Sequence, residues 1–450
     1  MLSNMVDFQL AEARQFPRAA GDVILRELES GATPNPDELP RRIAPTTAHS
    51  HTQPPMASRR VLLSAATRPI AAARPAARPT TLQVRAISAY GYEQAKALAF
   101  DKYGEPQDVL RLHQHSISPA HGDQLTLRFL AAPVNPADIN QIQGVYPSKP
   151  TFTTALSTPN PIAVGGNEGL AEVLSAGSSV KGLSRGDWVI MKQPGFGTWR
   201  THAQTDASNL LKIDNKEGLT PIQAGTVSIN PCTAYRMLRD FATLAEGDWF
   251  VQNGANSGVG RAAIQLGRLW GYRSINVIRA RPEGTDELKQ ELLDLGADVV
   301  VTDEELMAKG FGDRVKEWTN GGRDRVPLGL NCVGGKPATA LTKLLSPEAH
   351  FVTYGGMSKQ PVQLPTALLI FKNIHFDGFW VSRWGKEHPD EKKKTVDHVL
   401  DLIREGKFKD TPVDEVKWEW KTEQKTLVDA VQGTLEGFRS GKGIFVFGET

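Results

Sequence analysis

The stretch over residues 249–281 restricts the fold more than any other part of the chain. A short apolar run at 249–252 leads into a glycine-containing turn at 253–260, and apolar residues at helical spacing follow. A second apolar run at 275–278 then ends at a basic residue. This order predicts a strand-turn-helix-strand unit, which directs backbone N–H groups toward a pyrophosphate.

The turn itself has the residue types that such a site needs. Glycines stand where the backbone must come close to a phosphate or to the sheet, and Asn256 and Ser257 can form hydrogen bonds at the start of the helix. The predicted cofactor-binding residues of the turn are Asn256, Ser257, Gly258, Val259 and Gly260.

The residues after the second strand indicate which dinucleotide binds. Proteins that choose NAD usually place an acidic residue there, about 20 residues past the glycines, for the ribose 2′-hydroxyl. This chain has Arg279, Ala280 and Arg281 instead. Because two guanidinium groups would attract a 2′-phosphate, we predict an NADP(H) site that includes these three residues. The alternative is a solvated basic turn.

Composition sets wide limits. A chain of 450 residues has room for two or three domains, and 40% hydrophobic with 23% charged residues is ordinary for a globular protein. The net charge of +2 gives no strongly basic field and by itself argues neither for nor against nucleic acid. We expect no nucleic-acid partner. Two cysteines, Cys232 and Cys332, cannot form a disulfide framework or a thiolate zinc site. No run of about 18 apolar residues occurs, and we expect no membrane span.

The first 92 residues are predicted to be a disordered leader that contains a transit peptide. Residues 56–92 hold six arginines, many Ala, Ser and Thr residues, and no acidic residue, which is typical of mitochondrial import signals. Residues 1–55 carry seven acidic residues, which such signals avoid. We therefore expect Met56 to be the functional start and cleavage to fall near residues 85–88. A disordered basic linker is the alternative.

Residues 95–224 show short apolar runs separated by glycine and proline, which predicts a small β-rich barrel in front of the nucleotide unit. The segment GNEGLAEVLSAGSSVKGLSRGDWV, at 166–189, resembles the core of the medium-chain dehydrogenase/reductase superfamily. Zinc-bearing members use cysteine and histidine ligands in this barrel, but no cysteine precedes Cys232 here. His113 and His115 share one face of a probable strand without a third ligand nearby, so we expect no metal.

The segment VNPADINQIQGVYP, at 134–147, places a tyrosine on a loop. Asn135 and Pro136 interrupt a strand, a short helix follows, and Gly144 ends it just before Tyr146. A neutral phenol can donate a proton because its unperturbed pKa is about 10. From the residues alone, a packing role for this loop tyrosine stays open.

Six motifs taken together resemble one family. VNPADINQIQGVYP, NPCTAYRML, NSGVG, LNCVGGK, YGGM and GFWVS occur in the order found in the mitochondrial trans-2-enoyl-thioester reductases of fatty-acid synthesis, from about residue 95 to the end of the chain. The resemblance implies Tyr146 as the catalytic proton donor, a homodimer, the mitochondrial matrix, and an enoyl thioester on acyl carrier protein or coenzyme A as substrate. It also implies further NADPH contacts, namely Asn230, Tyr354, Gly355, Gly356, Met357, Phe379, Trp380, Val381, Ser382 and Lys442.

After residue 281, strand and helix patterns alternate as in a doubly wound parallel sheet, and residues 443–447 read as a final strand that returns to the barrel. The predicted α/β fold is thus a discontinuous GroES-like barrel domain, at 93–225 and 384–450, into which a Rossmann domain is inserted at 226–383. A solvated turn lysine is the alternative for Lys442, and a core-edge pair is the alternative for Phe379 and Trp380. Basic residues at 386 and 392–394 are one option for a carrier-protein docking face.

Two other functions compete with enoyl-thioester reduction. An NADPH:quinone reductase of the same superfamily needs the nucleotide site but no placed proton donor. A non-catalytic NADP(H)-binding co-regulator would bind the nucleotide without turnover.

The leader can be tested without the rest of the chain. We expect residues 56–92 fused to a fluorescent protein to enter mitochondria, because this segment is basic and lacks acidic residues. Fluorescence microscopy against a mitochondrial dye measures the result, and a fusion that stays in the cytosol contradicts the prediction.

Overall fold

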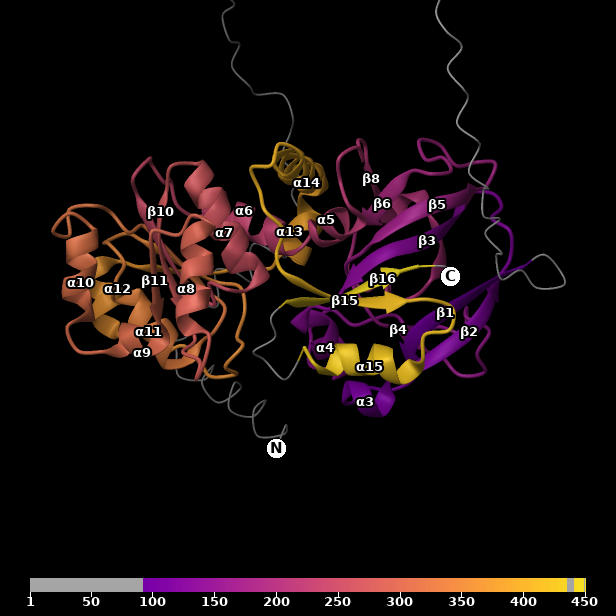
Figure 1. Ribbon diagram of the computed structural model, residues 1–450, viewed down its shortest axis with the longest axis horizontal. Coiled ribbons are helices and arrows are strands. Elements are labelled where there is room, and N and C mark those ends of the chain that lie inside the picture. The colour runs from indigo at the N-terminus through magenta and orange to yellow at the C-terminus, as the bar shows by residue number, and fades with distance from the viewer. Residues whose placement is uncertain (1–91, 435–440, 449) are drawn as a thin grey trace, which may run out of the picture. The chain divides into compact units, whose positions relative to one another are not determined.

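The computed structural model describes residues 92–434, 441–448 and 450 (Figure 1). The predicted leader and its transit peptide lie outside the described residues, apart from Tyr92. Within the described ranges, no helix has the length and apolar character that crossing a bilayer requires.

The nucleotide unit belongs to a six-stranded parallel sheet with the order β11-β10-β9-β12-β13-β14. Its strands are β9 (Trp249–Asn253), β10 (Arg273–Ile278), β11 (Val299–Thr302), β12 (Leu328–Asn331), β13 (His350–Thr353) and β14 (His375–Gly378). Counted from β9, this order is 3-2-1-4-5-6, the arrangement of dinucleotide-binding domains. The predicted doubly wound sheet is confirmed.

Helices cover both faces of this sheet, which explains its nearly continuous apolar strands. Phe250 of β9 packs with α6 (Asn230–Asp240) and α7 (Gly258–Leu269), while its neighbour Val251 packs on the opposite face with α10 (Phe311–Trp318) and α11 (Gly335–Thr342). The remaining helices of this part are α8 (Thr285–Asp294), α9 (Asp303–Met307) and α12 (Thr366–Lys372).

A seven-stranded, mainly antiparallel sheet and a three-stranded sheet form the barrel part. The seven strands are β3 (Gln124–Pro133), β5 (Leu170–Ala176), β6 (Trp188–Met191), β7 (His202–Asp206), β8 (Leu210–Ile213), β15 (Val413–Trp418) and β16 (Lys442–Phe447). The three strands are β1 (Glu93–Phe100), β2 (Arg111–Ile117) and β4 (Ala163–Val164). Short helices α3 (Pro106–Val109), α4 (Pro136–Ile142), α5 (Pro221–Thr226) and α15 (Gln424–Gln432) connect or cover them.

The end of the chain completes the barrel. Strand β16 pairs antiparallel with β3 and parallel with β15, so that yellow and indigo ribbons lie side by side in Figure 1. Large side chains from both chain segments, including Phe129, Trp199, Trp418 and Phe445, share one core. The predicted discontinuous barrel with an inserted nucleotide domain is confirmed.

Two helices lead from the parallel sheet back to the barrel. The charged segment at 384–394 is mostly helical, because it belongs to α13 (Val381–Glu387) and to α14 (Pro389–Arg404), which buries Val396, Val399 and Leu400 in the same core cluster as α6. The exact boundaries predicted for the domains stay predictions.

Candidate active site

The glycine turn after β9 is built by close backbone packing. Ser257 caps α7, and its Oγ accepts a hydrogen bond from the Gly260 N–H at 3.1 Å. A Cβ on Gly260 would lie 2.5 Å from the carbonyl oxygen of Ala255, and a Cβ on Gly258 would lie 2.7 Å from Nδ2 of Asn230. The glycines are therefore required by the turn itself and by Asn230, which brings helix α6 against the start of α7.

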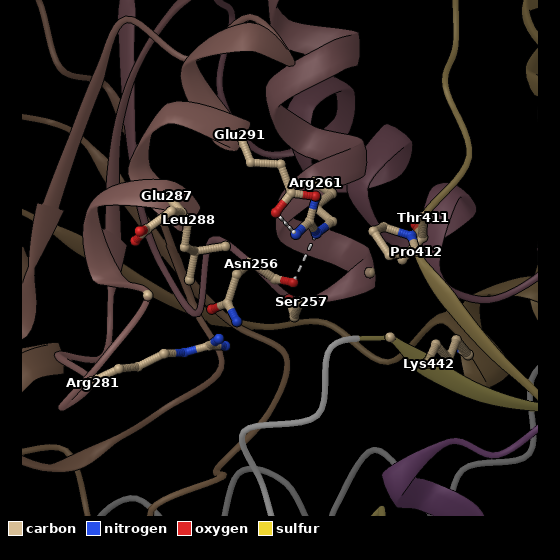
Figure 2. A pocket seen from close by; sticks show the side chains of 13 residues that line it. Asn256, Ser257, Arg261, Arg281, Glu287, Leu288, Glu291, Thr411, Pro412 and Lys442 are labelled. Carbon is tan, nitrogen blue, oxygen red and sulfur yellow. Dashed lines mark hydrogen bonds and ion pairs between the residues drawn. The ribbon is translucent and has the colours of Figure 1, made fainter.

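Arg261 holds this turn in place. Its Nε donates to the Asn256 carbonyl oxygen at 3.1 Å, and its Nη1 and Nη2 donate to the two carboxylate oxygens of Glu291 at 2.8 and 2.9 Å (Figure 2). The arginine is buried, and its hydrogen bonds lower the pKa of Glu291. Arg261 was not among the residues predicted from the sequence, where its signal was a charged residue within the apolar start of a predicted helix.

The basic residues after β10 divide into two environments. Arg281 lines a cavity of about 410 Å³ together with Asn256 and Ser257, and Figure 2 shows its side chain extending toward Asn256. Arg279 is exposed and does not line this cavity. The structure thus brings one of the two predicted arginines to the nucleotide turn, and places Ala280 in the loop, where its N–H donates to Asp303.

Buried amides connect the carboxyl ends of three neighbouring strands. Asn253 Nδ2 donates to Asn331 Oδ1 at 2.8 Å, and Asn331 Nδ2 donates to Thr353 Oγ1 at 3.2 Å. These side chains also accept backbone N–H groups of residues 332–334. The sequence signal for this hydrogen-bonded row was an asparagine at the end of each of two adjacent strands, Asn253 in β9 and Asn331 in β12. It fixes the loops that line the cofactor side of the cavity described next.

A larger cavity, of about 520 Å³, lies at these strand ends and reaches the barrel. The predicted residues that line it are Tyr146, Asn230, Ser257, Gly258, Val259, Tyr354, Gly355, Gly356, Met357, Phe379, Trp380, Val381, Ser382 and Lys442. Of the other predicted residues, Asn256 and Arg281 line the smaller cavity, while Gly260, Arg279 and Ala280 line neither. The two cavities share Ser257, Gly258, Gly441 and Lys442.

Tyr146 and Trp380 both line the larger cavity and are in contact with each other. The two rings meet edge to face, with centroids 5.9 Å apart and planes at 88°. Burial raises the pKa of Tyr146 above its usual value of 10, the Trp380 indole opposes this rise, and the carboxylate of Asp138 adds to it. The phenol therefore carries its proton at neutral pH and can act as a donor.

The lining of this cavity fits a dinucleotide. The Trp380 Nε1–H lies near the Tyr146 hydroxyl and the Tyr354 hydroxyl lies near Ser257 and Cys332, but neither buried group makes a hydrogen bond of good geometry among the described residues, so a ligand can supply a better partner. Gly356 leaves open space where a side chain would stand. Lys442 Nζ donates to Asn135 Oδ1 at 2.5 Å, so this lysine is not the solvated turn residue that the sequence left open.

The predicted histidine pair lies on strand β2, with the rings stacked 5.8 Å apart. Burial lowers the pKa of His115 to about 4. Within residues 92–434, 441–448 and 450, no three His, Cys, Asp or Glu side chains are grouped so that they could hold a metal ion.

A β-barrel completed by the last strand, with an inserted six-stranded parallel sheet and a cavity at its strand ends, defines a medium-chain dehydrogenase/reductase. Residues 121–215 match the alcohol dehydrogenase GroES-like domain family, and residues 258–403 match the zinc-binding dehydrogenase family. The chain is similar to proteins with bound NADP. One is the solved Etr1p/NADP/crotonyl-CoA complex, with a TM-score of 0.75, 40% identity, and coverage of 78% of this chain and 99% of that one.

Two relatives show which family within this superfamily the chain belongs to. The enoyl-[acyl-carrier-protein] reductase, mitochondrial, of Schizosaccharomyces pombe is 45% identical over 78% of this chain and 94% of its own length. The protein of the same name from Homo sapiens is 43% identical over 70% of this chain and 80% of its own length. The chain belongs to the family of mitochondrial enoyl-[acyl-carrier-protein] reductases.

The placement of the two arginines leads to a prediction about nucleotide choice. We expect Arg281→Ala to raise KM for NADPH about tenfold to a hundredfold, because a hydrogen bond to a charged group contributes about 1.5–3 kcal/mol. KM for NADH should change little. The matched control is Arg279→Ala, which should alter KM for NADPH less than about threefold. A larger loss in the Arg279 variant would contradict the placement.

Proposed function

We infer that this protein is an NADPH-dependent reductase that converts trans-2-enoyl thioesters to saturated acyl thioesters in mitochondria. It performs the last reductive step of fatty-acid synthesis there, on substrates carried by acyl carrier protein or coenzyme A. The observation that carries this inference is the phenol of Tyr146, held in the wall of a cavity that the nucleotide turn and the barrel line together. Family membership supports the same reaction.

The chemistry needs a hydride source and a proton source on one substrate. The thioester carbonyl withdraws electrons, so the β-carbon of the enoyl group accepts a hydride, which bound NADPH supplies. Negative charge then develops on the carbonyl oxygen, and the α-carbon must receive a proton. Tyr146 donates that proton, directly or through an ordered water, or stabilises the enolate.

The apolar and aromatic lining serves this reaction by excluding water. Phe379 and Trp380 follow strand β14 directly, and Val381 begins helix α13, so all three are placed by the sheet. Tyr146 comes from the barrel, on the loop after α4. The reacting thioester is thus enclosed by two parts of the chain, and a low local dielectric strengthens the hydrogen bonds made to its oxygen.

Tyr146→Phe tests the donor role. We expect turnover of trans-2-hexenoyl-CoA to fall roughly 10²–10⁴-fold, because a placed general acid contributes about that much. NADPH affinity, measured by fluorescence titration, should barely change. The control is Tyr103→Phe, which alters an exposed phenol outside the cavity lining. Unchanged turnover in the Tyr146 variant would refute the assignment.

An NADPH:quinone reductase activity is the enzyme alternative. A solved protein named as a putative NADPH:quinone reductase of Bacillus thuringiensis is 25% identical to this chain, with a TM-score of 0.65. Comparing NADPH oxidation with an enoyl thioester and with a simple quinone separates the two activities. A non-catalytic co-regulator would bind NADPH, reduce neither substrate, and be indifferent to the Tyr146 substitution.

The docking option for a carrier protein at residues 386 and 392–394 stays a prediction, but the structure shows that its lysines differ in exposure. Lys392 is buried and donates to the carbonyl oxygen of Lys192. Lys393 pairs with Asp214 and Asp397, and Lys394 pairs with Glu391. Lys393 and Lys394 are thus paired within helix α14 and its neighbours, and Lys386 and Lys394 are the exposed members of the proposed group.

A homodimer is the assembly that we propose. Helix α12 exposes Leu369, Ile370 and Phe371, the last two by 66% and 81%, next to β14 at the edge of the parallel sheet. Adjacent exposed apolar side chains of this size favour a protein contact. A related solved structure is named as the Etr1p/Etr2p heterodimer of Candida tropicalis.

The double variant Ile370→Asp/Phe371→Asp tests this face. Two charges on an apolar contact should convert a dimer into a monomer, because burying unpaired carboxylates is costly. Light scattering after size-exclusion chromatography measures the mass. The control is Met307→Asp, which adds a charge at an exposed apolar residue on α9. A double variant that keeps the wild-type dimer mass would contradict the proposal.

A further inference from the structure

Asp138 is a carboxylate buried directly behind the tyrosine loop. It is the third residue of α4 and is 1% exposed. Its Oδ2 accepts the Asn135 N–H at 2.7 Å, and its Oδ1 accepts Asn167 Nδ2 at 2.5 Å. A carboxylate in a capping box is common, but it normally stays in water, where its charge costs little. Here the charge is enclosed.

A chain of amides leads from Asp138 to the loop that carries Tyr146. Asn167 Nδ2 also donates to Gln141 Oε1 at 2.6 Å, and Gln141 Nε2 donates to the carbonyl oxygen of Ser148 at 2.9 Å. Ser148 follows Tyr146 by two residues, and the N–H of Tyr146 donates to the Asn140 carbonyl oxygen. Both sides of the tyrosine are therefore tied to helix α4 and its buried amides.

Two backbone groups fix which amide groups donate and which accept along this hydrogen-bonded chain, because one of them can only donate and the other can only accept. The Gly195 N–H can only donate, and it donates to Asn167 Oδ1 at 2.6 Å. The Asn167 NH₂ group must then face Asp138 and Gln141. The carbonyl oxygen of Ser148 can only accept, which orients Gln141 in turn. Both oxygens of Asp138 consequently accept hydrogen bonds from N–H donors, as an ionised carboxylate can. If Asp138 were protonated, its O–H would point at one of these N–H groups, and two donors would face each other.

The same carboxylate reaches the cofactor side through Asn135. Asn135 Oδ1 accepts from Lys442 Nζ, and Asn135 Nδ2 donates to Glu168 Oε2 at 3.0 Å. Glu168 Oε1 accepts from Ser228 Oγ and from the N–H of Ile229, at the start of α6. Asp138 is thus bonded to the residue that holds Lys442 and, through Asn167, to the residue that holds the tyrosine loop.

We propose that Asp138 is a positioning residue which, as a carboxylate, keeps the Tyr146 loop and the Asn135–Lys442 pair in the geometry that proton donation requires. The proposal rests on the donor role of Tyr146 inferred above. Asp138 lines the same cavity as Tyr146, but the phenol is the group that would donate the proton. Its contribution is to fix where that phenol stands.

The charges around Asp138 make the effect dependent on pH. Burial raises the pKa of Asp138 to about 7, the N–H of Asn135 and the amide of Asn167 oppose the rise, Lys442 on β16 also lowers it, and Glu168 before β5 adds to it. Tyr146 is the other titratable group that interacts with this carboxylate, and it stays protonated. Because this pKa lies above the ordinary value of 3.8, Asp138 ionises in the folded protein as pH rises through about 7. Turnover is therefore expected to fall on the acid side of pH 7.

The experiment is a pH profile of kcat for the full chain with NADPH and trans-2-hexenoyl-CoA, from pH 5.5 to 9. For the wild type we expect log kcat to fall with unit slope below about pH 7. Asp138→Asn removes the charge at nearly constant size and places an NH₂ group against a donor. Its kcat at pH 8 should be at least tenfold lower, and its acid limb should be absent.

Two further variants separate positioning from general damage. Gln141→Met removes the bond to Ser148 without adding a titratable group and leaves Asp138 in place, so kcat should fall while the acid limb remains. Asp187→Asn is the matched control, because Asp187 pairs with Lys212 on the barrel surface outside the cavity lining, and it should leave the profile unchanged.

Each outcome decides one question. An Asp138→Asn variant with kcat within twofold of the wild type at pH 8, or one that retains the acid limb, overturns the proposal. If that variant fails to fold, a Gln141→Met variant with kcat within twofold of the wild type at pH 8 overturns it instead. Full activity of Tyr146→Phe in the same assay would instead show that the donor assignment has failed.

Discussion

The hydrogen bond between Lys442 and Asn135 joins parts of the chain that are 307 residues apart, and the active site depends on it. It forms because the last strand, β16, pairs antiparallel with β3 and aligns Ile444 with Pro133. The start of β16 therefore lies next to the residues just after β3. These residues are Asn135 and the first turn of helix α4, which is followed by the loop that carries Tyr146. The entire nucleotide domain lies between these two strands in the sequence, so completing the barrel also places that domain against the tyrosine.

Buried polar groups lie on both sides of the cavity, but those on the nucleotide side are uncharged and those on the barrel side include two carboxylates. On the nucleotide side, the Asn253–Asn331–Thr353 row is uncharged and ties loops to strand ends. On the barrel side, Asp138 and Glu168 are buried carboxylates near one lysine. Buried ions are expensive unless every oxygen has a donor, and the oxygens of both carboxylates accept hydrogen bonds. On the barrel side, burying these two carboxylates costs stability, and their hydrogen bonds fix the orientation of the side chains around them.

Most of the fold could be read from periodicity. Alternation of apolar strands and helical spacings over residues 249–301 predicted β9, α7, β10 and α8 within a few residues, because both faces of a parallel sheet are covered and its strands are continuously apolar. Helix α13 was missed, since the Trp380–Val381 motif reads as the end of a strand and its helical continuation is charged. The bond partners of residues 392–394 were also out of reach, because a run of lysines has the same appearance whether it is solvated or paired.

By itself, the sequence determined the class of fold, the nucleotide turn and the chemical types at the site, since glycines, basic residues and a loop tyrosine carry their constraints locally. The tertiary structure decided which of those residues meet. It brought Arg281 to the turn and left Arg279 exposed, and it turned Asp138 from a helix cap into a buried carboxylate bonded to Asn167. The physical reason is that burial and hydrogen-bond direction depend on strand pairing between distant segments, which local residue patterns do not encode.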